Sequence, residues 1–207
     1  MNDSRRLKIV VVNSLVAPDG ADQAALEQAD RARALRIGLL ENGYNLLAAL
    51  PPADDLEEQI AKLQPDLIIV DEQSDAALKR VVAATANARR PIVCFTEDND
   101  RAKMHAAIQA GVSAYVVAGL SADRVKAVLD VAMARFEVEQ KLRDELEETR
   151  NKLAERKVIE RAKGLLMERQ QCTEDEAYSR LRRLAMDKNL RLGEVAQRML
   201  DVADLLA

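Results

Sequence analysis

"PDLIIVD", residues 65–71, places four consecutive apolar residues, Leu67–Val70, between two aspartates. A short apolar run rich in β-branched residues is typical of a strand buried on both faces of a parallel sheet. Further runs of this character occur in the first 120 residues of the chain. The sequence therefore predicts five buried strands, at residues 7–12, 44–50, 65–70, 91–95 and 113–117.

Amphipathic helical patterns alternate with these strands. The predicted helices cover residues 31–42, 54–63, 75–87 and 101–110. Gly43 and Gly111 stand where a glycine commonly ends a helix. This alternation predicts an α/β fold, with a flavodoxin-like, doubly wound parallel sheet of five strands in the order 2-1-3-4-5. One irregularity is the long polar stretch 13–30, which separates the first strand from its helix.

The pattern becomes wholly helical from residue 121 onward. Four residues there recur at spacings of 4, 3 and 4 and form a short heptad seam: Leu142, Leu146, Thr149 and Leu153. Because so short a seam is stable mainly with a partner, it predicts a coiled coil and a homodimer. A solvated single helix is the alternative interpretation.

The segment 156–207 carries three amphipathic helical patterns, which predict an all-α, three-helix bundle. Thr173 and Glu176 form a capping box that marks the start of the second of these helices. The chain is thus expected to divide into an α/β domain at 1–120, a coiled-coil dimerisation helix at 121–155 and the bundle at 156–207.

Charge is unevenly distributed along the 207 residues. The formal net charge is −4, yet residues 156–191 hold ten basic and six acidic side chains. A polyanion is therefore expected to bind this segment. Only 2% of the residues are aromatic, which argues against a sugar-binding cleft and against a wide base-stacking platform.

Neither a signal peptide nor a membrane span is evident, so the protein is expected to be cytoplasmic. Cys94 and Cys172 lack metal-ligand spacing and are expected to be free thiols. The sequence has no glycine-rich phosphate loop, zinc spacing or nucleophile elbow, and His105 has no nearby nucleophile. We therefore expect no enzymatic activity, no catalytic residues, no metal and no cofactor.

The first 120 residues resemble the receiver domain of response regulators. "PDLIIVD" ends at the phospho-acceptor position, Asp71, and "PIVCFT" ends at the switch position, Thr96. "AGVSAYVVAGL" resembles the last receiver strand.

Three positions depart from the receiver pattern. Asn13 and Ser14 stand where the pattern has an acidic pair that holds Mg²⁺, and Ala118 stands where it has a lysine. Asp71 alone is a poor magnesium site, and the charge of an acyl phosphate would lack compensation. The resemblance therefore implies a pseudo-receiver in which Asp71 is inactive as a phosphoryl acceptor.

Basic residues gather in the C-terminal segment around one tyrosine. The candidates for RNA contact are Lys163, Arg169, Tyr178, Arg180, Arg182, Arg183 and Lys188. Tyr178 and Arg182 are four residues apart, so a phenol ring and a guanidinium lie on one helix face where an unpaired loop base could stack. The alternatives are that the arginines are merely solvated, that Tyr178 only closes the bundle, and that Lys163 only extends along its surface.

The segment "VIERAKGLLMERQQCTEDEAYSRLRRLAMDKNLRLGEVAQRML" resembles an ANTAR domain, the RNA-binding module of antitermination regulators. Together with the receiver-like part, the chain is similar to NasT-type regulators of nitrate assimilation. This resemblance implies a transcription antitermination regulator that binds paired hairpins in the leader mRNA of nitrate and nitrite assimilation genes. It also implies control by a cytoplasmic nitrate- or nitrite-sensing protein that resembles nitrate-binding proteins, in place of phosphorylation.

Three other functions stay open from the residues alone. The first is a phosphorylation-responsive regulator. The second is a DNA-binding response regulator, since three helices with a basic middle one resemble a helix-turn-helix. The third is a protein-interaction module that binds no nucleic acid.

Overall fold

The computed structural model describes residues 6–13, 23–71, 74–117 and 122–205. The chain divides into two compact units, Met1–Glu139 and Gln140–Ala207. This division into two units follows compactness alone and does not test the three predicted domains, whose limits therefore stay a prediction.

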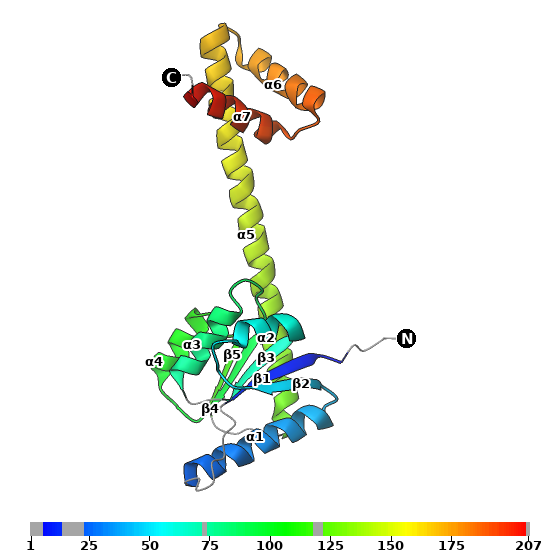
Figure 1. Ribbon diagram of the computed structural model, residues 1–207. Coiled ribbons are helices and arrows are strands. Elements are labelled where there is room, and N and C mark those ends of the chain that lie inside the picture. Colours follow the sequence, from blue (N-terminus) through cyan, green and yellow to red (C-terminus); the bar gives the residue numbers. More distant parts are fainter. Residues whose placement is uncertain (1–5, 14–22, 72–73, 118–121, 206–207) are drawn as a thin grey trace. The chain divides into compact units, whose positions relative to one another are not determined.

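The first unit contains a five-stranded parallel sheet in the order β2-β1-β3-β4-β5 (Figure 1). Its strands are β1 Lys8–Val12, β2 Asn45–Leu50, β3 Leu67–Asp71, β4 Ile92–Thr96 and β5 Ala114–Val117. Each lies within two residues of a predicted run, and the predicted strand order is confirmed. The central β3 is buried along its whole length, as its continuous apolar pattern requires.

Helices cover both faces of the sheet and give the first unit two apolar cores. These helices are α1 Gln23–Glu41, α2 Leu56–Leu63, α3 Asp75–Ala84, α4 Arg101–Gln109 and the first part of α5 Ala122–Gln170. Successive strand residues point to opposite faces. Ile68 and Val70 therefore join the core under α2, α3 and α4, while Leu67 and Ile69 join the core under α1 and α5.

Helix α1 begins at Gln23, eight residues before the start that the sequence predicted. The predicted start was wrong because residues 23–30 show little apolar periodicity, and Leu26 is 51% exposed. This stretch is rich in Ala, Glu and Gln, whose high intrinsic helix propensity favours the additional turns of α1.

The second unit is built from the C-terminal part of α5, α6 Glu174–Lys188 and α7 Leu192–Leu205. Figure 1 shows α6 and α7 beside the last turns of α5. Leu166, Leu181 and Ala196 are buried in the core that these three helices share, so the predicted bundle is confirmed. Helix α5 is continuous over 49 residues, with no break between its heptad seam and its part in the bundle. Within the described residues, no helix combines the length and apolar character needed to cross a membrane.

Candidate functional site

The carboxyl ends of the strands carry the receiver-like positions. Asn13 follows β1 and is 3% exposed. Its backbone N–H donates to Leu50 O over 3.0 Å. Its side-chain Oδ1 is buried and accepts no hydrogen bond within the described part of the chain. Asp71 ends β3, is 6% exposed and pairs in register with Phe95 of β4. Ser14 and Ala118 lie outside the described residues. Among the described residues, no cluster of His, Cys, Asp or Glu is large enough to hold a metal ion.

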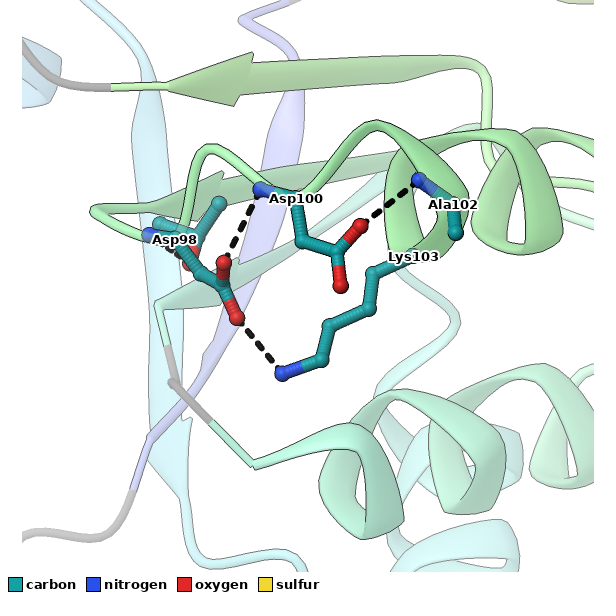
Figure 2. A network of polar contacts seen from close by, with 5 residues as sticks. Asp98, Asp100, Ala102 and Lys103 are labelled. Carbon is teal, nitrogen blue, oxygen red and sulfur yellow. Dashed lines mark hydrogen bonds and ion pairs between the residues drawn. The ribbon is translucent and has the colours of Figure 1, made fainter.

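Thr96, the last residue of β4, anchors a polar network in the loop before α4, and Figure 2 shows Asp98, Asp100, Ala102 and Lys103 of this network. Its Oγ1 accepts from the Asp98 N–H over 3.1 Å, and Asp98 Oδ1 accepts from the Asp100 N–H over 2.9 Å. Asp100 then caps α4 by accepting from the Ala102 N–H over 2.8 Å. Lys103 Nζ lies 2.6 Å from Asp98 Oδ2. The Lys103 hydrogen bond lowers the pKa of Asp98, and the same bond raises the pKa of Lys103. The loop therefore holds a cation that sequence reasoning did not identify, since no helical spacing relates residues 98 and 103.

Cys94 on β4 is a buried, unreactive thiol. Burial, followed by the negative charges of Asp71 and Asp75, raises its pKa to about 12. The thiolate needed for nucleophilic chemistry is therefore scarce at neutral pH.

In the second unit, the predicted capping box fixes the start of α6. Glu176 N–H donates to Thr173 Oγ1 over 3.4 Å, and Thr173 N–H donates to Glu176 Oε2 over 3.0 Å. These bonds satisfy amides that the first helical turn would leave without partners. The capping box therefore defines where α6 begins.

Lys163, a predicted RNA contact, is only 7% exposed and forms two ion pairs. Its Nζ lies 2.9 Å from Glu160 Oε2 and 2.6 Å from Glu174 Oε1. Hydrogen bonds to Glu160 and Glu174 raise the pKa of Lys163, and the pKa of Glu174 is lowered. The structure thus gives Lys163 a role in joining α5 to α6, whether or not it also contacts RNA.

The other RNA-contact candidates are exposed. On α6, Ala177, Leu181 and Ala185 are buried, whereas the basic side chains lie on the remaining surface. The exposed cations are Arg169, Arg180, Arg182, Arg183 and Lys188.

Tyr178, the aromatic residue among the candidates, is also exposed, with 44% of its surface accessible. Arg180 donates a hydrogen bond to Gln170 Oε1. For Arg182 and Arg183, the described residues provide no ion-pair partner. A ring and two guanidinium groups on one exposed helix are therefore available to a ligand.

Comparison with known proteins identifies the C-terminal part of the chain. The family model of the ANTAR domain matches residues 147–200. The nitrate regulatory protein of Klebsiella oxytoca is 44% identical over 66 residues, which is 32% of this chain and 17% of that protein. Both similarities concern a limited part of the molecule.

Other similarities extend further. The structure of NtrX from Brucella abortus aligns with 67% of this chain and 29% of that chain, with a TM-score of 0.50 and 17% identity, a likeness of fold alone. The transcriptional regulatory protein PdtaR of Mycobacterium tuberculosis is 30% identical over 191 residues, or 87% of each protein. Since this last similarity spans most of both molecules, the chain belongs to the family of ANTAR-domain response regulators of transcription that includes PdtaR.

Proposed function

We propose that this regulator acts in the cytoplasm as a transcription antitermination factor that binds paired hairpins in leader RNA. The observation that supports this most directly is the exposure of Arg182 and Arg183 on α6, without ion-pair partners among the described residues, inside the ANTAR-matched segment. Cations without ion-pair partners can neutralise phosphates and release the counterions of RNA. Tyr178 adds an exposed ring on the same helix.

Pairing of α5 would give the protein two RNA-binding bundles. Three leucines of the heptad seam, Leu142, Leu146 and Leu153, are 61%, 51% and 55% exposed in the single chain. A second copy of the chain would cover them in a coiled coil. Two bundles joined in this way would bind two neighbouring hairpins at a high effective concentration, which offsets the small size of each basic surface.

The input to the regulator is proposed to come from a protein partner in place of phosphorylation. Asn13, Ser14 and Ala118 lack the side chains that hold magnesium and a phosphoryl group in receivers. Lys103, the cation found near these strand ends, is engaged by Asp98. A cytoplasmic protein that senses nitrate or nitrite is the proposed partner, in line with the similarity to the nitrate regulatory protein of Klebsiella oxytoca.

The test is an affinity titration of the full chain at two salt concentrations. The RNA is a leader from nitrate-assimilation genes that carries both hairpins, and the controls are a leader with one loop scrambled and a promoter DNA duplex. We expect tight, salt-sensitive binding to the intact leader alone. Equal binding to all three would contradict RNA specificity. Leu146→Asp should yield a monomer in sedimentation and should weaken binding to the paired hairpins more than binding to a single hairpin.

A further inference from the structure

An apolar groove of about 450 Å³ opens on the surface of the C-terminal bundle, between the ends of α5 and α6 and along α7. Its walls include Leu165 of α5, Leu184 of α6, and Met199 and Val202 of α7. Leu184 is 39% exposed and Val202 is 55% exposed. The apolar side chains of the groove are therefore accessible to a ligand in the folded bundle.

Three cations border this groove, one from each helix: Arg169, Lys188 and Arg198. None of them forms an ion pair with another described residue, and no acidic residue lines the groove. Lys163, on the same helix as Arg169, provides the contrast, because two glutamates neutralise its charge. In a chain with a net charge of −4, the groove is thus a local site for an anion that also has an apolar surface.

We propose that this cationic groove receives one unpaired base from an RNA hairpin loop. The base would lie against Leu184 and Val202, while Arg169, Lys188 and Arg198 would contact the phosphates on either side of it. This inference rests on the proposed RNA-binding function, and it assigns the bound base to a surface distinct from Tyr178. It also adds Arg198 of α7, which the sequence did not single out, to the RNA interface.

The size of the groove favours a nucleotide over a folded protein partner. Twelve residues line it, whereas a stable protein interface involves about 20–30 residues on each side. Its volume falls in the range of about 300–1,000 Å³ that is typical of sites for small molecules. An extruded base presents two flat apolar faces with a phosphate on each side, which matches apolar walls bordered by cations.

The side-chain amide of Gln170, which also lines the groove, can recognise the base. The Gln170 Oε1 accepts a hydrogen bond from Arg180. Its amide NH₂ is then oriented by that bond and can donate to an acceptor on the edge of the base. Arg180 would accordingly act through Gln170, as a residue that positions the recognition group.

The experiment fills the groove and measures RNA binding. Val202→Phe adds bulk at an exposed wall position, and Val202→Gln removes apolar contact without adding a ring. The ligand is a single leader hairpin that carries 2-aminopurine at one loop position after another. We expect wild-type protein to change the fluorescence strongly at one position only, and both variants to abolish that change and weaken binding by about tenfold or more.

A charge variant and a matched control accompany these substitutions. Arg198→Ala should weaken binding and lower its salt dependence, whereas Arg161→Ala, which removes an exposed cation of α5 outside the groove, should do neither. Thermal unfolding of each variant verifies that the bundle remains folded.

The outcomes separate this inference from the proposed function. If wild-type protein does not bind the hairpin, the proposed function itself fails. If wild-type protein binds, Arg182→Ala weakens binding and both Val202 variants bind like wild type, RNA binding stands and the groove proposal is overturned. The groove would in that case be free for a protein partner.

Discussion

The Lys163 Nζ of α5 lies 2.6 Å from the Glu174 Oε1 in the first turn of α6. The same ammonium lies 2.9 Å from Glu160 Oε2, so two carboxylates hold one nearly buried cation. Because α5 ends at Gln170 and α6 begins at Glu174, this contact closes the turn between two helices of the bundle. Lys163 therefore links α5 to α6 in the C-terminal bundle.

This ion pair predicts that acid destabilises the bundle. The hydrogen bond from Lys163 lowers the pKa of Glu174 in the folded state, so its stabilising effect is present above the ordinary glutamate pKa of about 4.3 and is lost as the pH falls below it. The melting temperature should drop between pH 5 and the low pKa of folded Glu174, and this drop should be smaller in Glu174→Gln. Calorimetry over this pH range measures it. Glu168→Gln, at an exposed position of α5, is the control and should behave like wild type.

The capping box predicts a defined loss of stability. Thr173→Ala removes the acceptor for the Glu176 N–H and should cost about 1 kcal/mol. Thr173→Ser keeps a hydroxyl and should cost much less. Denaturant titration of both variants provides the measurement, and an equal loss in the two would show that the hydroxyl contributes nothing.

Arg182 and Lys163 should differ in what their removal changes. Arg182→Ala should weaken hairpin binding by about tenfold, lower the salt slope by about 0.7 and leave the melting temperature unchanged, because this side chain is exposed. Lys163→Ala should lower the melting temperature, because it leaves Glu160 and Glu174 without their cation. The double variant should no longer bind the paired hairpins.

Filter binding with parallel thermal melts distinguishes these effects. Lys157→Ala, at an exposed position of α5, is the matched control for charge removal. Unchanged affinity in Arg182→Ala would remove this residue from the interface.

Most of the fold could be predicted from the sequence, because short continuous apolar runs such as Leu67–Val70 require burial on both faces. The start of α1 could not, since its first turns have helix propensity but no apolar face. The ion pairs of the candidate site could not be predicted from the sequence either. Lys103 meets Asp98 across a loop, and Lys163 meets Glu174 across a helix end, so neither pair has a spacing that predicts contact.

The strand ends predict that phosphorylation has no effect on the regulator. By resemblance, Asn13 stands where receiver domains have a magnesium-binding acid, and Lys103 is paired with Asp98. An acyl phosphate on Asp71 would therefore lack the charges that stabilise it. Acetyl phosphate with Mg²⁺ should therefore leave the hairpin affinity unchanged, and Asp71→Asn should bind RNA like wild type. Phosphate-affinity electrophoresis tests acyl phosphate formation directly. A shifted band that disappears in Asp71→Asn would refute the pseudo-receiver interpretation.

Transcription through a terminator tests antitermination most directly. A template that carries the paired-hairpin leader and its terminator is transcribed in vitro with increasing protein, and the full-length fraction of the RNA is measured. We expect wild-type protein to raise this fraction and the Lys163→Ala, Arg182→Ala double variant to leave it unchanged. A full-length fraction that stays constant while wild-type protein saturates the leader would contradict antitermination.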